Sequence, residues 1–347
     1  MMRLTTMIAL CVGGALLAGC GGGRTKLPDE PPLGVALITP DIEDDRSINQ
    51  IAYNSLQVLK DRLLAKVSHD VVRPDEGGIE SSIRYYAKQN VQLIICNSSR
   101  YQSSVRQVAR QFPKIAFVVI GGQATEDNLM SVSFRFEEPA YLCGILAGGL
   151  TKKGRAVCIG GEAQPFVYRS FAAFANGGRV IDKYFKSKEV YTKNWIDGRI
   201  SQKLADKAIK DGADIIFPIL HRANLKVIDE VKAADGVYTF GVFSNQMAEA
   251  SSVVAASIVV RLDDFFLDVA RSVQGGRFKG KHVVFTLKNG NLDFVINPGM
   301  NLEIEARVRN RLASAKERII SGTLKVLKDD LPAPPKSGEP SLTPVGP

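Results

Sequence analysis

The chain has 347 residues, of which 45% are hydrophobic and 23% are charged, and its formal net charge is +9. This composition excludes a disordered chain and a protein built mainly of membrane spans. The length fits two lobes of ordinary domain size, which can enclose a cleft. The basic residues are scattered among acids and accompany no motif that reads DNA or RNA, so we expect no nucleic-acid partner.

The chain begins with a pattern that is typical of a secretory signal. Arg3 precedes an apolar run that is too short for an ordinary membrane span. The run ends in "LAGC" at 17–20, which resembles the lipobox of bacterial lipoproteins, where the Cys becomes the lipidated first residue. We therefore predict a signal peptide over 1–19, lipidation of Cys20, and a Gly-rich tether over 20–32. This places the protein in the bacterial cell envelope, lipid-anchored and extracytoplasmic.

From Leu33 onward, short β-rich runs alternate with amphipathic stretches, which is typical of parallel α/β sheets. In the first half of the chain the predicted strands are 34–39, 91–96, 115–121 and 129–134, and the predicted helices are 48–64, 79–88 and 105–111. A helix of small residues over 140–150 then leads to the basic break Lys152-Lys153-Gly154, where we expect the chain to cross between lobes.

The same alternation follows in the second half. The predicted strands are 156–161, 189–195, 213–220 and 237–243, and the predicted helices are 167–184, 201–210 and 223–234. A helix over 253–273 is expected next, followed by a hairpin of 282–287 with 292–297 across an Asn-Gly turn, and by a helix over 302–320.

These elements predict an α/β fold with two lobes, each a mostly parallel sheet flanked by helices. Lobe 1 is expected to comprise 33–151 with about 279–325, and lobe 2 to comprise 152–278. Two crossings between the lobes would make a hinge. The Pro-rich segment 331–347 has few large apolar residues, so we expect a disordered tail.

Sequence motifs for catalysis are absent: there is no phosphate-binding loop, nucleophile elbow, zinc-protease motif or C-x-x-C pair. The three histidines, His69, His221 and His282, fall in different predicted elements. We therefore expect no enzyme, no metal and no cofactor. A hydrolase that uses scattered carboxylates is the alternative that the sequence leaves open.

Three cysteines remain after the signal and the lipid site. Cys96, Cys143 and Cys158 lie in apolar surroundings, so we expect buried thiols. A disulfide between Cys143 and Cys158 is the alternative, which their placement in separate predicted core elements disfavours.

An acidic stretch, "ITPDIEDDRSINQ" over 38–50, separates the first strand from the first helix. Ser47 and Gln50 match the capping box S-x-x-Q, so Ser47 is expected to cap the helix. Asp44 and Asp45 would then face the positive end of the helix dipole. The loop also lies where a parallel sheet binds ligands, and Asn49 there has an amide that could serve a polar ligand.

This stretch resembles the first motif of the basic membrane protein family, the purine-nucleoside receptor-like lipoproteins that are substrate-binding proteins of ABC transporters. Further blocks are similar in order: "RQFPKIAFVVIGG", "SVSFRFEEPAYLCGILAG", "NWIDGRISQKLADKAIKDGADIIFP" and "GVFSNQ". The resemblance covers most of 33–309. It implies the two-lobed type I periplasmic-binding-protein fold.

The resemblance also implies a ligand site. Two rings sandwich a purine in that family, and their positions here are Ile48 and Trp195, the latter followed by the acid Asp197; Trp195 as an ordinary core residue is the alternative. The family's Asn is kept as Asn49, and Asp41 stands next to the position of its early acid.

The side that would hold a sugar departs from the family pattern. Phe243 stands at an acid position, Val260 stands at a Lys position next to Arg261, and His221 and Arg222 replace a Gly-rich stretch. Trp195 with Phe243 is therefore a second candidate pair of rings, and Arg222 a candidate for an anionic group.

The resemblance thus predicts a lipid-anchored, extracytoplasmic solute-binding protein of an ABC importer, without enzymatic activity. Its partners would be a nucleoside or a related aromatic small molecule, an ABC permease, and the membrane through its lipid. The alternative is a surface lipoprotein with this fold but a role outside transport, as an adhesin, a sensor or an envelope accessory.

Overall fold

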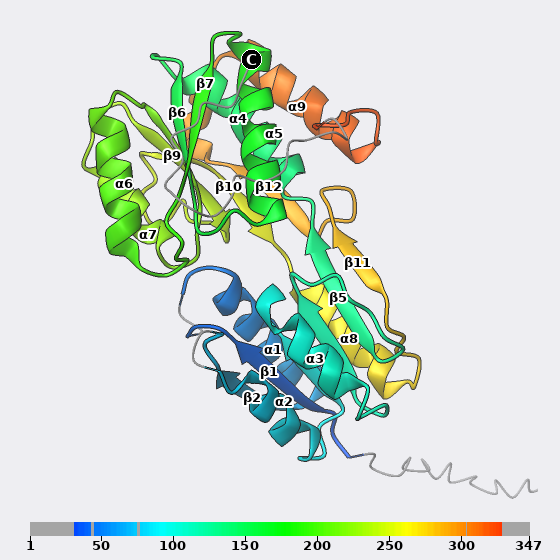
Figure 1. Cartoon of the computed structure of the whole chain (residues 1–347). Helices are drawn as coiled ribbons and strands as arrows, with labels where there is room; N and C mark the ends of the chain where they lie inside the picture. Colours follow the sequence, from blue (N-terminus) through cyan, green and yellow to red (C-terminus); the bar gives the residue numbers. More distant parts are fainter. Residues whose placement is uncertain (1–30, 43–44, 75–76, 303, 328–347) are drawn as a thin grey trace, which may run out of the picture. The chain divides into compact units, whose positions relative to one another are not determined.

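The computed structural model describes residues 31–42, 45–74, 77–302 and 304–327 (Figure 1). The predicted signal peptide, Cys20 and nearly all of the tether lie outside these residues, as do Asp44 and the predicted tail. Within the described ranges, no helix has both the length and the apolar character that a membrane span needs.

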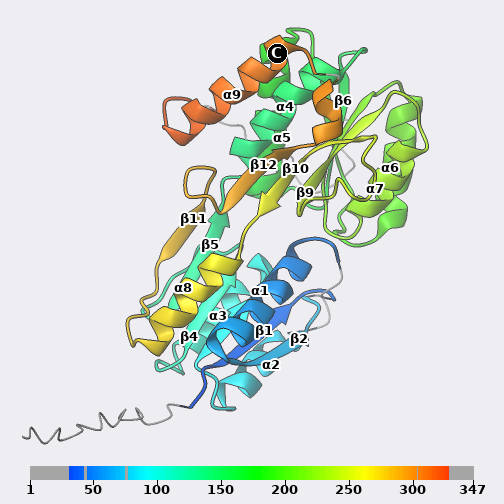
Figure 2. The same cartoon turned by 180° about the vertical axis from the view of Figure 1, so that it is seen from behind.

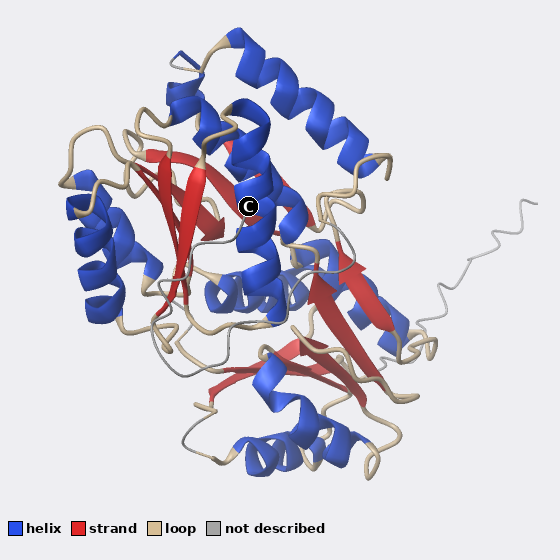
Figure 3. Cartoon of the chain, turned by 45° about the horizontal axis from the view of Figure 1, so that its top comes forward, coloured by secondary structure: helices blue, strands red, loops and turns tan. Residues whose placement is uncertain are grey.

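The described strands form two sheets (Figure 3). Those of the first sheet are β1 (Gly34–Thr39), β2 (Lys66–Val71), β3 (Leu93–Cys96), β4 (Ala116–Ile120), β5 (Leu129–Phe134) and β11 (His282–Phe285). Their spatial order is β11-β5-β4-β3-β1-β2, and every neighbouring pair is parallel. All residues of β1, β3 and β4 are buried, as expected for central parallel strands.

The strands of the second sheet are β6 (Arg155–Gly160), β7 (Lys186–Tyr191), β8 (Ile215–Ile219), β9 (Tyr238–Phe243), β10 (Val254–Val260) and β12 (Leu292–Ile296). Their order is β12-β10-β9-β8-β6-β7. The pairs are parallel except for β10 with β12, which is antiparallel. The predicted fold class, two mostly parallel sheets flanked by helices, is confirmed.

Helices cover both faces of each sheet (Figure 2). They are α1 (Ile48–Leu63), α2 (Ile79–Ala87), α3 (Gln102–Ala109) and α8 (Asp263–Gln274) on the first sheet, and α4 (Glu137–Leu150), α5 (Pro165–Ile181), α6 (Gly198–Lys210), α7 (Asn224–Lys232) and α9 (Ala306–Ile320) on the second. Side chains alternate between the faces of a strand. Leu37 of β1 therefore shares a core with α1 and α8, whereas its neighbour Ile38 packs with α2 and α3. On the second sheet, Phe217 packs with α4, α5 and α9, and Ile216 packs with α6 and α7.

Glycines let α4 and α5 approach each other closely. A Cβ atom at Gly144 would overlap the carbonyl oxygen of Phe174, and one at Gly177 would overlap the carbonyl oxygen of Tyr141. The small residues that mark 140–150 in the sequence therefore serve the contact between these two helices.

Two predictions in the last third of the chain are wrong. The expected helix over 253–273 is a buried strand, β10, followed by a helix that begins only at Asp263. The expected hairpin does not form, because β11 pairs with β5 in the first sheet while β12 pairs with β10 in the second.

The strand pairing bears on the expected lobe bounds as well. Within 279–325, which was expected to join the first lobe, β12 lies in the second sheet and α9 packs against α4. The strand β2 was not expected at all. The bounds of the lobes stay a prediction.

The thiols lie where they were expected. Cys96, Cys143 and Cys158 are buried and free in the described part of the chain, so the alternative disulfide does not form. Burial raises the pKa of each thiol well above its ordinary value, so these side chains behave as small apolar groups.

Candidate functional site

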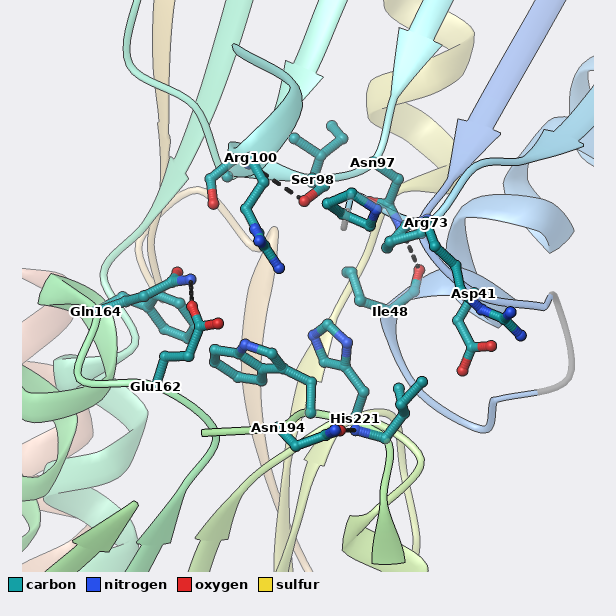
Figure 4. A pocket seen from close by; sticks show the side chains of 18 of the residues that line it. Asp41, Ile48, Arg73, Asn97, Ser98, Arg100, Glu162, Gln164, Asn194 and His221 are labelled. Atoms are coloured by element: carbon teal, nitrogen blue, oxygen red, sulfur yellow. Dashed lines mark hydrogen bonds between the residues drawn. The ribbon is translucent and has the colours of Figure 1, made fainter. Parts of the chain in front are cut away.

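A cavity of about 220 Å³ lies between the carboxyl ends of strands from the two sheets (Figure 4). Its lining comes from the segments that follow β1 to β4 and β6 to β8, and from the end of β5. This is where ligands of open parallel sheets bind. The described lining residues are Pro40, Asp41, Ile48, Arg73, Pro74, Asn97, Ser98, Ser99, Arg100, Ile120, Gly121, Ser133, Phe134, Glu162, Gln164, Phe166, Lys193, Asn194, Trp195, Ile196 and His221.

Four residues singled out in the sequence line this cavity. Asp41 and Ile48 stand on the wall of the first sheet, and His221 stands on the wall of the second (Figure 4). Trp195 follows β7 and belongs to the wall of the second sheet as well. The fold thus brings together residues that are up to 180 positions apart, since Asp41 and His221 occupy one site. Whether each of them touches a ligand stays a prediction.

The other four predicted residues, Asn49, Asp197, Arg222 and Phe243, are not among the described residues that line the cavity. Arg222 is partly exposed and pairs with a lining residue, with its Nη2 atom 3.5 Å from Oδ2 of Asp41. Asp197 caps α6 by accepting a hydrogen bond of 2.9 Å from the N–H of Arg199. The Arg199 side chain beside it lowers the pKa of Asp197.

Aromatic rings form the wall of the second sheet. Within the described residues, Phe136, Phe166, Trp195, His221 and Phe243 make a closed ring of contacts, with centroid distances between 4.9 and 5.9 Å. Phe166 stacks on Trp195 at an interplanar angle of 16°, and His221 contacts both Trp195 and Phe243. Phe243 is buried, packs against His221 and is not among the described lining residues, and its pairing with Trp195 around a ligand stays a prediction.

His221 is neutral in this wall. Burial lowers the pKa of its imidazole to about 4, from an ordinary value near 6.5. At neutral pH the ring therefore serves as an uncharged aromatic group with one donor and one acceptor nitrogen.

Among the described non-glycine residues with left-handed backbone, one lines the cavity, Lys193, and two lie near it, Arg46 before α1 and Phe243 at the end of β9; Leu64 and Asn90 lie elsewhere. Arg46 has φ 51°, Lys193 has φ 57° and Phe243 has φ 70°. Such conformations cost free energy for residues other than glycine, and they gather at functional sites. At the cavity itself, Lys193 is therefore the lining residue whose backbone conformation is costly.

The start of α1 differs from the predicted capping box. Ser47 occupies the N-cap position but makes no capping hydrogen bond through its side chain. The carboxylate of Asp45 instead accepts from the N–H groups of Ser47 at 2.8 Å, Asn49 at 3.4 Å and Gln50 at 3.0 Å. A carboxylate offers two acceptor atoms and a full charge at the helix N-terminus, so it replaces the Ser hydroxyl. Asp45 thus lies where the acidic stretch predicted a carboxylate.

Asn49 has no exposed surface, and its amide is engaged at both ends. Its Nδ2 atom donates to Asp45 Oδ2 at 2.8 Å, and its Oδ1 atom accepts from Asn97 Nδ2 at 2.7 Å. Asn49 therefore stands behind Asn97, which lines the cavity. A direct contact of Asn49 with a ligand stays a prediction.

Several lining residues were not found from the sequence. Asn97 begins "NSSR" directly after a correctly predicted strand, so the polar segment at that sheet edge was a usable signal. Arg73 follows β2, the strand that was not expected. Phe166 opens α5 and gives no local sign that its ring stacks on Trp195.

The chemistry of the lining groups suits noncovalent binding of a small organic molecule. Among the described residues, no group of three or more His, Cys, Asp or Glu side chains is arranged to hold a metal ion. The rings of Phe166 and Trp195, together with amide, hydroxyl, carboxylate and guanidinium groups from both walls, suit a small planar molecule with polar edges.

Comparison with known proteins agrees with this architecture. A solute-binding protein of an ABC transporter system from Aeropyrum pernix K1 has the same fold, with a TM-score of 0.77, 18% identity, and coverage of 85% of this chain and 93% of that chain. The fold is thus the type I periplasmic-binding-protein fold that the resemblance implied.

Two bacterial relatives align over most of their length. A purine-binding protein of Brucella abortus is 26% identical over 321 residues, which cover 92% of this chain and 88% of that protein. A transcriptional activator protein of Bacillus subtilis is 25% identical over 295 residues, which cover 84% and 90%. The family model described as "ABC transporter substrate-binding protein PnrA-like" matches residues 33–329. The chain therefore belongs to the PnrA-like family of ABC transporter substrate-binding proteins.

Proposed function

We propose that this protein is a lipid-anchored, extracytoplasmic solute-binding protein that captures a purine-like ring and delivers it to an ABC permease. The observation that carries the proposal is the cavity itself, which has Trp195 and Phe166 on one wall and the polar side chains of Asp41 and Asn97 on the other. The name of the Brucella relative, a purine-binding protein, supports the ligand class.

The size and charge of the site favour a free base or another small heteroaromatic ring over a whole nucleoside. A volume of about 220 Å³ lies below the range of roughly 300–1,000 Å³ that is usual for drug-sized ligands. The positions that would hold a sugar offer no free acid and base: Phe243 and Val260 are buried apolar residues, and Arg261 pairs with Asp293 at 2.8 Å.

Binding between two walls would couple affinity to closure. A ring that contacts residues of both sheets stabilises the arrangement in which the walls face each other, as in hinged binding proteins. A bound ring should therefore also raise the melting temperature by mass action.

The experiment that tests this function is native mass spectrometry of protein purified without refolding, joined to a thermal-shift screen of nucleobases, nucleosides and other aromatic metabolites. We expect a co-purified small molecule or a saturable rise in melting temperature. If no compound shifts the melting temperature at millimolar concentration, the ligand class is wrong.

The anchor is tested separately. Fractionation of cells that express Cys20→Ala should find the variant soluble, whereas the wild type should be found with the membrane. Retention of both in the membrane fraction would contradict lipidation at Cys20.

A role outside transport is the second candidate. It is supported by the apolar residues at the expected sugar positions and by the Bacillus relative, which is named as a transcriptional activator. A permease and an ATPase encoded beside this chain would favour transport, and normal uptake of the bound compound in a deletion strain would favour the second candidate.

A further inference from the structure

The wall of the first sheet contains two buried oxygen atoms without a hydrogen-bond donor. Oδ1 of Asn97 and Oδ2 of Asp41 have no hydrogen-bond partner among the described residues, although these side chains are only 4% and 2% exposed. Both residues line the cavity. Oδ2 of Asp41 still has an ion-pair partner, since Nη2 of Arg222 lies 3.5 Å from it. A buried acceptor that is left unpaired costs roughly 1–3 kcal/mol, so Oδ1 of Asn97 calls for a donor that the described residues do not supply.

The two atoms come from neighbouring strand ends. β1 and β3 are adjacent and parallel, and the N–H of Asn97 donates to the carbonyl oxygen of Ile38 at 2.8 Å. Asp41 follows β1 by two residues, and the hydroxyl of Thr39 holds its backbone carbonyl at 2.8 Å. The backbones of both residues are thus held by hydrogen bonds to β1.

A chain of hydrogen bonds sets which end of the Asn97 amide faces the cavity. Ionised Asp45 can only accept, so Asn49 must turn its NH₂ group toward Asp45 and its oxygen toward Asn97. Asn97 must then turn its own NH₂ group toward Asn49, where the distance is 2.7 Å. The reverse orientation of Asn97 would bring two amide oxygens together at that distance, which is repulsive.

Further contacts hold this arrangement in place. The backbone N–H groups of Ser47 and Gln50 occupy the other oxygen of Asp45, and Asn97 Nδ2 also lies 3.4 Å from the carbonyl oxygen of Ile48 (Figure 4). Asp45, Asn49 and Asn97 are all buried, so water does not compete for these bonds. The amide oxygen of Asn97 is left toward the cavity as the free end of the relay.

We propose that Asn97 is the residue that determines specificity on this wall, that it acts as a hydrogen-bond acceptor, and that the relay Asp45–Asn49–Asn97 fixes this polarity. The molecule that fits is a heteroaromatic ring whose edge carries an N–H or amino donor. This inference rests on the proposed function, and it adds which edge of the bound ring the site recognises, namely one with an N–H or amino donor.

Calorimetric titration with three small probes tests the inference. In 9-methylpurine there is no N–H donor, purine adds a ring N–H, and 9-methyladenine adds an amino group. At least one donor-bearing probe should bind the wild type about tenfold more tightly than 9-methylpurine, which is the scale of pairing one buried acceptor. In Asn97→Ala this ratio should fall below about threefold.

Two further variants distinguish an effect on ligand selectivity from an effect on protein stability. Asp45→Asn has nearly the same shape but removes the acceptor-only end of the relay, so the preference for a donor-bearing probe should shrink while the ring still binds. Ser47→Ala is the matched control, because its buried hydroxyl makes no hydrogen bond in the described residues, and it should keep the wild-type ratio. Since a ratio of two affinities is measured on each variant, partial destabilisation cancels.

The possible failures are distinguishable. If 9-methylpurine binds the wild type as tightly as both donor-bearing probes, or if Asn97→Ala keeps the tenfold ratio, Asn97 does not read a donor and this inference is overturned while ring binding stands. If none of the three probes binds at millimolar concentration, the proposed ligand class fails, and the inference fails with it.

Discussion

The carbonyl oxygen of Arg46 accepts a hydrogen bond of 2.7 Å from the hydroxyl of Ser244, which joins the loop after β1 to the loop after β9. Gln246 Nε2 donates to the same oxygen at 3.2 Å, and the Arg46 guanidinium pairs with the carboxylate of Glu249. These contacts connect segments of the two sheets beside the cavity without taking part in its lining. They should therefore stabilise the state in which both walls are in place.

Charge reversal tests this link. Arg46→Glu or Glu249→Arg alone should weaken binding of the tightest purine probe by about two- to fivefold, because attraction between exposed side chains worth up to about 1 kcal/mol turns into repulsion. The double variant should recover most of the affinity. Titration of the four proteins forms a double-mutant cycle. If the losses of the two single variants add up in the double variant, the interaction between Arg46 and Glu249 does not contribute to binding.

Gly161 controls the position of Trp195. A Cβ atom at Gly161 would lie 2.5 Å from Cδ2 of the indole, so Gly161→Ala must displace the ring. We expect a loss of about 1–3 kcal/mol in binding of a purine probe, the range seen when an aromatic is removed from a stacked base. If the loss acts through the ring, Gly161→Ala should cost nothing further in a Trp195→Ala background, as measured by calorimetry; an equal loss there would contradict this reading.

The helix cap predicts different stabilities for two neighbouring variants. Asp45→Ala removes the acceptor for the N–H groups of Ser47, Asn49 and Gln50, so the free energy of unfolding should fall by about 2 kcal/mol. Ser47→Ala should change it by less than about 0.5 kcal/mol. Urea denaturation measures both free energies. A larger loss in Ser47→Ala than in Asp45→Ala would show that Ser47 caps the helix, as the capping box predicts.

The pKa of His221 predicts how stability depends on pH. Its folded-state pKa of about 4 lies below its ordinary value near 6.5, so the unfolded chain takes up the proton first as pH falls. Relative to His221→Gln, the wild type should therefore lose stability from pH 6.5 down to pH 4, by at most about 3 kcal/mol. The difference should be constant above pH 7. Burial also raises the pKa of Asp45 to about 6, which acts in the opposite sense, but both proteins share it and it cancels in the difference.

The central strands could be predicted from the sequence because they are continuous apolar runs between turn residues. The strand β2 gave no such run, since "KVSHDV" lies at a sheet edge and none of its residues is buried. The stretch "VVAASIVV" was assigned to a helix because a fully buried strand that leads into a true helix has no period to separate the two. The Asn-Gly turn at 289–290 gave a correct turn but the wrong partners, because strand pairing depends on distant segments.

Only the site residues that align with motifs of the family could be predicted from the sequence. Trp195 and Asp41 were found because each stands beside a family motif at a strand end. Asn97 was missed because its role depends on contacts with Asp45 and Asn49, about 50 residues earlier in the chain. Contacts between residues so far apart cannot be predicted from one sequence. The stack of Phe166 on Trp195 is equally a product of the fold.

Trp195 offers the most direct test of the central claim that this cavity binds a purine-like ring. It is the one Trp among the 347 residues and it lines the cavity, so its fluorescence reports on this site alone. The measurement is a titration of intrinsic emission with adenine, hypoxanthine, guanine and their nucleosides. We predict a saturable change in emission with at least one of them at micromolar concentration, and weaker binding of the same compound to Asn97→Ala. Emission that stays unchanged with every compound up to millimolar concentration would contradict the account.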